Sequence, residues 1–356
     1  MAVEAGSALL PLTISDARPA DPCGRDTAQS HHHNAASDPD ALPAESYVCS
    51  PYTAYVSYSR EELPKVGNIA LERVLGALIG AVGLALDRCR IDDVVFVNNW
   101  LLSTNLYPRW DCAGLDELTA LCAARWPGHA VAFRSLNSWT NAPLIERLLC
   151  AGYFLVPSRQ VYLFDGREGA FARRSNTRAD LKLLDRDDCE IVEHDNLNAT
   201  HCDRFEALYR MLYLEKYTPL NPQYTAEFMR AGLETRWLHF TALRGPGGEL
   251  DGVLGTFEVD GVLTAPIVGY DTRKPRALAL YRRLMALVLR EALDRSLLLN
   301  LSSGASGFKR LRGGQAAVEY TAVYTRHLPP ARQAAWRGLA AVVNRIGLPI
   351  LTRYEL

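Results

Sequence analysis

Three strand-like segments follow one another in the second half of the chain and are joined by short turns. They are Trp237–Leu243, Gly252–Val259 and Val262–Tyr270, and each is rich in the β-branched and aromatic residues that favour strands. Asp260-Gly261 joins the last two, and an Asp-Gly pair between apolar runs is a strong hairpin signal. Any fold of this chain must therefore be built around an antiparallel meander.

The segments around the meander alternate between helical and strand-like patterns. Before it we expect a strand at Glu190–Val192 and helices at 200–215 and 224–232. After it we expect a helix at 276–295, a strand at Leu297–Leu301, a short helix at Phe308–Leu311, a strand at Glu319–Tyr324 and a final helix at 330–347. This order is typical of a layered α/β domain.

The first half shows a similar alternation after a polar start. Residues 1–45 are rich in Ala, Asp, Ser, Pro and His and are predicted to be a disordered tail. Aromatic and β-branched residues predict a strand at Tyr47–Tyr58, and Asn68 can cap a helix that runs to Arg88. The remaining predicted elements are a strand at Val94–Val97, a helix at 114–126, a strand at Val131–Phe133, a helix at 141–151 and strands at Tyr153–Val156 and Gln160–Phe164.

The length of the chain indicates two compact domains, since 356 residues exceed a typical single domain. We predict an α/β architecture of two domains, each with a mixed twisted sheet flanked by helices. The predicted divisions are the tail at 1–45, an N-terminal domain at 46–165, a catalytic domain at 166–328 and a basic C-terminal helix at 329–356.

Charge and hydropathy favour a cytoplasmic protein without a membrane segment. The net charge is −1, so no global attraction to nucleic acid or membranes exists. The N-terminus lacks a basic region followed by an apolar core, and the apolar run Val74–Leu86 is shorter than the ~20 residues that cross a bilayer. The run His31–His33 has no further ligands at a useful spacing, and no metal site is predicted.

Four stretches resemble the GNAT acyltransferases, and more narrowly the FemX-like branch with two GNAT-like units. They are the basic helix Arg173–Leu184, the meander Leu250–Asp271 with Gly252, Phe257, Gly261 and Tyr270-Asp271, the helix Ala277–Leu293, and Gly304–Gly313, which resembles a Gly-x-x-x-Phe/Tyr-Lys element. The resemblance implies tandem GNAT-like domains and amide formation by direct attack of an amine on an acyl donor. No covalent enzyme intermediate and no tightly bound cofactor are implied.

The segment that binds pyrophosphate in acetyl-CoA-dependent members departs from their pattern. Here it reads Arg273 to Ala279, without either glycine, and Pro275 has no N–H to donate. Three cations remain as candidate donor-binding residues: Arg273, Lys274 and Arg276. The loss of the backbone cradle favours a donor held elsewhere, such as aminoacyl-tRNA or an acyl carrier protein.

Two side chains near the meander are candidates for proton transfer. Glu258 ends the second strand, where it is either a base or a surface residue beside the hairpin. Tyr270 ends the third strand, where a GNAT-like active site opens, and serves either acid/base work or core packing.

Small and basic residues after the strand Leu297–Leu301 are candidates for donor binding. Ser302, Ser303 and Gly304 allow close approach of a ligand to the backbone. Lys309 and Arg310 follow at once, and by resemblance Lys309 lies near the nucleotide end of the donor. A plain turn is the alternative.

Substrate-binding candidates come from two loops. Lys216 and Tyr217 precede a Pro-bounded loop and form either a substrate-facing rim or a frayed helix end. Asn98 follows a buried strand, where it either hydrogen-bonds a substrate or forms a turn.

The C-terminal part of the chain carries a local excess of positive charge. Residues 305–354 contain eight cations and one acid, Glu319, an excess of seven that would attract tRNA or an acidic carrier protein. We therefore expect an aminoacyl- or acyltransferase that acts on a small amine with aminoacyl-tRNA as donor. The alternatives are an acyl-CoA- or acyl-carrier-protein-dependent N-acyltransferase and a non-catalytic binding module.

Overall fold

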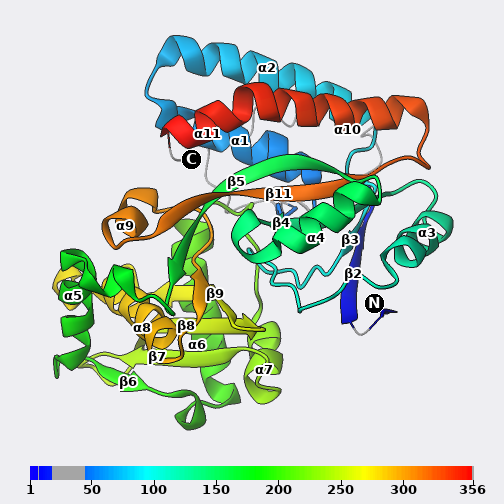
Figure 1. The fold of residues 1–356 in the computed structure, drawn as a ribbon. Coiled ribbons are helices and arrows are strands. Elements are labelled where there is room, and N and C mark those ends of the chain that lie inside the picture. The colour runs from blue at the N-terminus through cyan, green and yellow to red at the C-terminus, as the bar shows by residue number, and fades with distance from the viewer. Residues whose placement is uncertain (7, 18–44, 355–356) are drawn as a thin grey trace.

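One mixed sheet runs through the whole molecule. A computed structural model describes residues 1–6, 8–17 and 45–354. Its eleven strands lie in the order β1-β2-β3-β4-β11-β5-β10-β9-β8-β7-β6, and helices flank the sheet (Figure 1). The predicted α/β class with a mixed sheet and flanking helices is confirmed.

The strands and helices have the following bounds. The strands are β1 (Ala2–Ala5), β2 (Ala8–Ser15), β3 (Val94–Val97), β4 (Ala130–Leu136), β5 (Phe154–Asp165), β6 (Glu190–Val192), β7 (His239–Arg244), β8 (Leu250–Val259), β9 (Val262–Tyr270), β10 (Leu298–Asn300) and β11 (Gln315–Tyr324). The helices are α1 (Tyr58–Glu62), α2 (Ile69–Arg88), α3 (Leu115–Arg125), α4 (Ser138–Cys150), α5 (Ser175–Leu181), α6 (Cys202–Arg210), α7 (Ala226–Glu234), α8 (Leu280–Asp294), α9 (Ser306–Leu311), α10 (Pro330–Val342) and α11 (Leu348–Tyr354).

The two halves of the chain exchange strands at the centre of the sheet. β5, the last strand of the first half, pairs with β10 of the second half. β11, the last strand of the second half, lies between β4 and β5 and is antiparallel to both. The halves therefore share an uninterrupted hydrogen-bonded sheet. The domain boundaries drawn from the sequence stay a prediction.

Helices cover both faces of the first half. Val94 and Phe96 of β3 pack with α10 through Trp336, together with Leu86 of α2. Val95 and Val97 point to the opposite face, where α3 and α4 form a second core. This alternation follows from the two-residue period of a strand and explains why β3 is a continuous apolar run.

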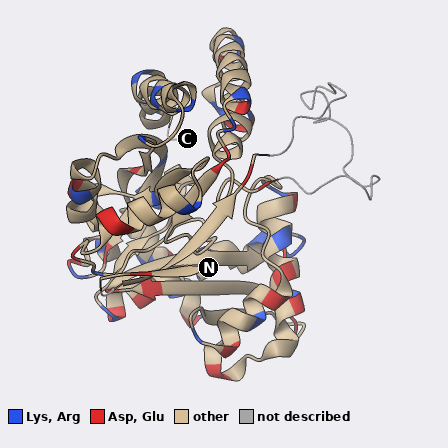
Figure 2. Ribbon diagram, turned by 90° about the vertical axis from the view of Figure 1, so that its right-hand side faces the viewer, with Lys and Arg blue, Asp and Glu red and all other residues tan. Residues whose placement is uncertain are grey.

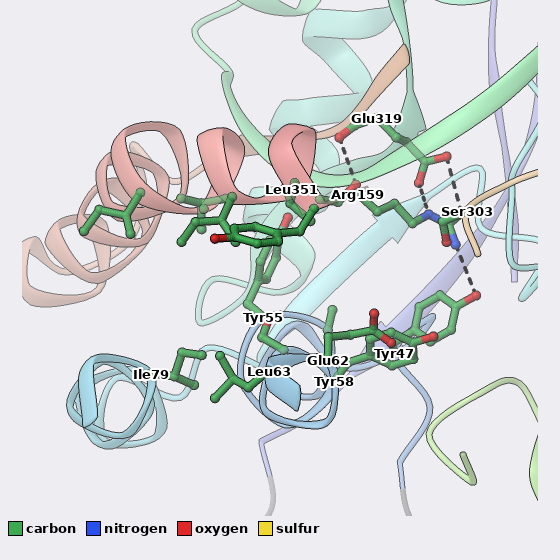
Figure 3. A pocket seen from close by; sticks show the side chains of 18 of the residues that line it. Tyr47, Tyr55, Tyr58, Glu62, Leu63, Ile79, Arg159, Ser303, Glu319 and Leu351 are labelled. Atoms are coloured by element: carbon green, nitrogen blue, oxygen red, sulfur yellow. Dashed lines mark hydrogen bonds and ion pairs between the residues drawn. The ribbon is translucent and has the colours of Figure 1, made fainter. Parts of the chain in front are cut away.

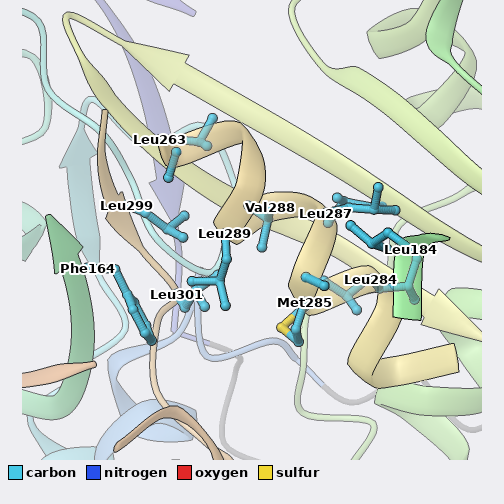
Figure 4. Packing of buried hydrophobic residues seen from close by; sticks show 14 of the residues in the cluster. Phe164, Leu184, Leu263, Leu284, Met285, Leu287, Val288, Leu289, Leu299 and Leu301 are labelled. Carbon is cyan, nitrogen blue, oxygen red and sulfur yellow. The ribbon is translucent and has the colours of Figure 1, made fainter. Parts of the chain in front are cut away.

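The second half has the same three layers. On one face α8 buries Leu284, Val288 and their neighbours against β8, β9 and β10, and Figure 4 shows this packing around Leu263 and Leu299. On the other face α6 and α7 pack on β7, β8 and β9. The predicted meander is confirmed as β7, β8 and β9, which pair antiparallel.

The prediction of a disordered tail is wrong for the described residues at the N-terminus. β2 pairs antiparallel with β3, and β1 folds back on β2. Ala8, Leu10 and Leu12 point inward while Leu9 is exposed, which is the alternation of a half-buried strand. Pairing with β3 makes this segment a strand although it lies in a stretch of polar composition. Residues 18–44, which include His31–His33, lie outside the described residues.

The predicted strand at Tyr47–Tyr58 is wrong: residues 47–49 form a turn and residues 51–58 are helical. A π-helix covers Thr53–Ser57 and continues into α1. Val56 is fully buried and packs with Tyr52 and Tyr55, so the aromatic residues meet the core at helical spacing. Tertiary packing therefore overrides the strand propensity of these residues. The two strands predicted within 153–164 are one strand, β5.

α2 is confirmed as a helix and is unusually apolar. The Asn68 side chain caps it by accepting a hydrogen bond from the Leu71 amide at 3.1 Å. By length and composition alone it could cross a membrane, with a mean hydropathy of 1.9 over its most apolar window. Only 17% of that window is buried, so packing within the core does not account for its apolar residues.

Replacing Leu10 and Leu9 separately tests the N-terminal strand. Leu10→Ala should lower the free energy of unfolding by about 2–5 kcal/mol because it removes fully buried methyl groups. Leu9→Ala, one residue away and 63% exposed, should change it by about 0.5 kcal/mol or less. Chemical denaturation measures both free energies. Equal small effects would support the original prediction that this segment is disordered.

Candidate functional site

The parallel strands β9 and β10 separate in the middle of the sheet. Their pairing covers three residue pairs and ends at Thr264 and Asn300. β9 continues to Tyr270 with β8 alone as its neighbour, so no strand of the described chain pairs with its other edge. Backbone N–H and C=O groups on that edge are available for a ligand.

The turn after β10 is held by a buried lysine. The Lys309 ammonium donates to the carbonyl oxygens of Leu301 at 2.7 Å, Ser302 at 3.2 Å and Ser303 at 2.7 Å. Burial, and then Arg159, lower the pKa of Lys309 to about 7. The three carbonyls oppose this shift because they favour the ammonium form. Lys309 thus fixes the Ser302–Gly304 turn from within.

Lys216 and Tyr270 meet where β9 ends. The Lys216 ammonium donates to the Tyr270 hydroxyl at 3.1 Å and lies 5.8 Å from the ring centre of Tyr217. The hydrogen bond to Tyr270 is the main cause that raises the pKa of Lys216. The structure therefore brings together three of the predicted site residues.

Two predicted donor-binding cations form ion pairs beside α8. Arg273 pairs with Asp271 at 2.8 Å, and Lys274 pairs with Asp251 at 3.0 Å. Arg273 is the main cause that holds the pKa of Asp271 well below its usual range. Arg276 begins a short 3-10 turn, and Ala279 enters α8 with a left-handed backbone (φ 51°). Arg273 and Lys274 are thus partly neutralised, which limits their attraction for pyrophosphate.

Two further predicted residues lie away from Tyr270. Glu258 pairs with Arg295, at the hairpin end of β8 that is opposite to the end of β9. Asn98 is buried, donates to the Leu106 carbonyl at 2.8 Å and accepts from the Trp100 indole at 3.1 Å. Both side-chain groups of Asn98 are used inside the loop after β3.

A charged pair that the sequence analysis missed lies at the centre of the sheet. Arg159 of β5 and Glu319 of β11 are directly opposite each other, and their closest atoms, Nε and Oε1, are 2.8 Å apart. Burial lowers the pKa of Arg159, but the charge of Glu319 and the hydrogen bonds with Glu319 and Tyr47 together raise it. In the sequence Arg159 lies between two predicted strands and Glu319 begins another, so neither position was expected to be buried within a strand.

A second buried arginine continues this polar cluster. Arg134 of β4 donates to the Leu102 carbonyl at 2.8 Å and to the Asn99 side chain at 3.2 Å. Arg159 also bonds to the Ser103 carbonyl, to Thr104 at 3.2 Å and to the Tyr47 hydroxyl at 3.3 Å. The two guanidinium groups therefore anchor the loop after β3.

A cavity of about 540 Å³ begins at this cluster. Its polar end contains Arg159, Glu319, Tyr47 and Ser303 (Figure 3). The rest is bounded by α1, α2, α10 and α11, whose side chains facing it are mostly aliphatic. The volume lies within the ~300–1,000 Å³ range of small-molecule sites.

Aromatic rings connect the cavity with the end of β9. Phe308 lines the cavity and lies 5.0 Å from Tyr281, which in turn lies 6.2 Å from Tyr270 (ring centres). On the other side the Tyr47 amide donates to the Leu220 carbonyl at 3.1 Å, in the loop that follows Lys216 and Tyr217. The cavity and the Lys216–Tyr270 pair are thus parts of one region between the two halves.

The C-terminal cations do not form one basic surface. Lys309 and Arg312 are buried, and Arg312 pairs with Asp180. Arg332 pairs with Asp93 at 3.2 Å, whereas Arg310 is exposed on α9. Figure 2 shows basic and acidic positions interspersed along the ribbon. The excess counted along the sequence is therefore distributed over several sites.

Three potential metal ligands meet at the start of β3. One ligand atom each of Asp16, Asp93 and His129 lie within 4.8 Å of one another. Asp93 is already paired with Arg90 at 2.7 Å and with Arg332, and Asp16 is exposed. The arginines supply the positive charge that a cation would otherwise bring.

Known proteins are similar to this chain only in structure. No family model and no curated protein matches it. The C-terminal domain of a putative lysylphosphatidylglycerol synthetase from Agrobacterium fabrum is 15% identical with a TM-score of 0.46, over 65% of this chain and 78% of that chain. L-PGS from Bacillus licheniformis is 13% identical (TM-score 0.44, 62% and 76%) and FemX is 6% identical (0.45, 61% and 82%). We therefore take the function from the residues of the site.

The buried pair at the sheet centre can be tested against a surface pair. Glu319→Gln should lower the free energy of unfolding by about 3 kcal/mol or more because Arg159 stays buried without its counter-charge. Glu258→Gln, which removes the more exposed pair with Arg295, should cost about 1 kcal/mol or less. Denaturant titration measures the free energy of unfolding of both variants. Similar losses would show that the Arg159–Glu319 pair contributes no more to stability than a surface pair.

Proposed function

We propose that this protein is an N-acyltransferase that forms an amide on a small amine by direct attack on a carrier-bound acyl group. The observation that carries the proposal is the separation of β9 and β10, which leaves a free strand edge beside the Ser302–Gly304 turn. Acyl transfer to an amine needs positioning, proton removal and donors for the developing oxyanion. The region between the two halves offers a group for each of these tasks.

The free edge of β9 supplies the oxyanion donors in this proposal. A backbone N–H beyond Thr264 polarises the carbonyl of the acyl group, and the amine nitrogen attacks its carbon. The bond to the carrier oxygen or sulfur then breaks as the amide forms, and the proton lost by the amine is transferred through Tyr270 to the leaving oxygen or sulfur. Fixed backbone donors are well suited to this role because they need no reorganisation as charge develops.

Tyr270 is the proposed proton-transfer group. Its hydroxyl accepts a hydrogen bond from the Lys216 ammonium at 3.1 Å, which holds that hydroxyl in place at the end of β9. Gly269 allows α6 to approach the strand closely at this point, since a Cβ there would lie 2.5 Å from the Tyr209 amide nitrogen. The backbone around Tyr270 is therefore held rigidly between α6 and β8.

The carrier of the acyl group is proposed to bind outside the Arg273–Ala279 segment. Arg273 and Lys274 are engaged by Asp271 and Asp251, and the sequence lacks the glycines of a phosphate cradle. Aminoacyl-tRNA, an acyl carrier protein and acyl-CoA are the three donor classes to compare. A small-molecule amine is the proposed acceptor.

Removing one hydroxyl distinguishes the two predicted acid/base residues. Tyr270→Phe should lower kcat by about 10²-fold or more because it removes the proton-transfer group and keeps the ring. Glu258→Gln should leave kcat within about three-fold, since this side chain pairs with Arg295 at the far end of the hairpin. Amide formation from each radiolabelled donor class measures both variants.

The same assay decides whether the proposal stands. Product from any one donor class, lost in Tyr270→Phe, supports amide-forming acyl transfer and identifies the carrier. Absence of product with all three classes, from protein that unfolds cooperatively, would refute it. A larger loss of kcat in Glu258→Gln than in Tyr270→Phe would assign the proton transfer to Glu258.

A further inference from the structure

We propose that the cavity between α2 and α10–α11 binds a long aliphatic acyl chain, with the carbonyl end of the acyl group beside Arg159 and Ser303. The assignment rests on the proposed function, which requires an acyl donor, and it names the class of acyl group. The polar end of the cavity includes Ser303 of the turn that lies beside the free edge of β9. A chain bound here would present its carbonyl toward that edge.

Apart from its polar end and the ion pair of Glu62 with Lys65 at the end of α1, the walls of the cavity are mostly apolar. α2 contributes Leu75 and Ile79, α10 contributes Leu339, and α11 contributes Leu351, while Leu63 follows α1. Figure 3 shows Ile79 and Leu63 on the side of the cavity away from Arg159 and Ser303. An unbranched hydrocarbon matches such walls because it leaves no polar group without a partner.

The polar end of the cavity carries more positive than negative charge. Arg134 and Arg159 are cations, and Glu319 is the carboxylate that pairs with Arg159. Lys309 lies just behind, under the Ser303 carbonyl. This arrangement favours a group with partial or full negative charge, such as the oxygen of a carbonyl or a carboxylate. The cavity is therefore amphipathic in the same sense as a fatty acyl group.

The composition of residues 18–44 does not match the aliphatic walls. Residues 18–44 contain a single large aliphatic residue, Leu42, and no aromatic residue. Such a segment would bury unpaired polar groups against the aliphatic walls. A ligand with a long apolar part avoids this cost.

The inner face of α2 is complementary to this ligand. No residue of α2 between Arg73 and Asp87 is charged, yet little of the helix is buried in the protein core. Its residues Leu75, Leu78, Ile79 and Val82 face the cavity, whereas Leu84 is 60% exposed. The apolar inner face of α2 would thus contact the acyl chain.

Binding of saturated fatty acids of increasing length tests the proposal directly. Calorimetric titration of the full chain should show Kd falling about four-fold for each added methylene until the cavity is full, and then levelling off. Kd values that do not depend on chain length would overturn it. This measurement needs no variant and no acyl transfer.

Bulky substitutions on the two faces of α2 provide the matched comparison. Ile79→Trp should shorten the longest accepted chain and weaken binding of that chain about fifteen-fold, the equivalent of two methylenes. Leu84→Trp, on the exposed face, should leave every Kd unchanged. Leu78→Trp is a second inner variant, and thermal unfolding of each protein shows that it is folded. Equal effects of inner and outer variants would overturn the proposal.

Two further titrations identify the source of the acyl chain. Uptake of a labelled acyl chain from vesicles of an anionic phospholipid indicates a membrane lipid, and uptake from an acyl thioester alone indicates a soluble donor. Both results support an aliphatic ligand, and failure of both overturns it. Chain-dependent binding without amide formation would refute the proposed function alone. Amide formation from acetyl donors without dependence on chain length would refute the cavity assignment alone.

Discussion

The ion pair between Arg159 and Glu319 lies where the two halves of the chain are joined. The two residues face each other across β5 and β11, at the point where the register of these strands shifts. Arg159 also holds Tyr47 and the loop after β3, so one guanidinium group connects three segments that are distant in sequence. Because Glu319 is buried and Arg159 is largely buried, neither charge can be lost without leaving the other uncompensated. The shape of the polar end of the cavity depends on this pair.

The parts of the fold that the sequence predicted correctly are those whose signals are local. The Asp260-Gly261 turn, the Asn68 cap and the periodicity of α8 each specify an element from neighbouring residues. The strand exchange could not be found in this way, because β5 and β11 are ordinary apolar strands and only their three-dimensional neighbours differ. β2 was not predicted for the same reason, since its eight residues become a strand by pairing with β3.

The sequence identified individual candidate site residues, but it did not show which of them lie together. Lys216, Tyr217 and Tyr270 were singled out from separate segments, and the structure brings them together. Lys309 was expected to face a donor, yet its ammonium points to the carbonyls of its own turn. In the sequence, Glu319 stood out as the one acid among the C-terminal cations. A buried charge pair requires two partners, and neither partner shows from its own segment that the other is opposite.

A helix that is apolar over most of its surface but poorly buried needs a physical reason. For α2 the inner face borders a cavity whose other walls come from α10 and α11, so three helices from the two ends of the chain enclose one space (Figures 1 and 3). The strand exchange makes this possible, because β11 lies beside β4 and leads the C-terminal helices back over the first half. Sheet topology, the central ion pair and the hydropathy of α2 therefore converge on one cavity, and an acyl chain with a polar head has the polarity that this cavity requires.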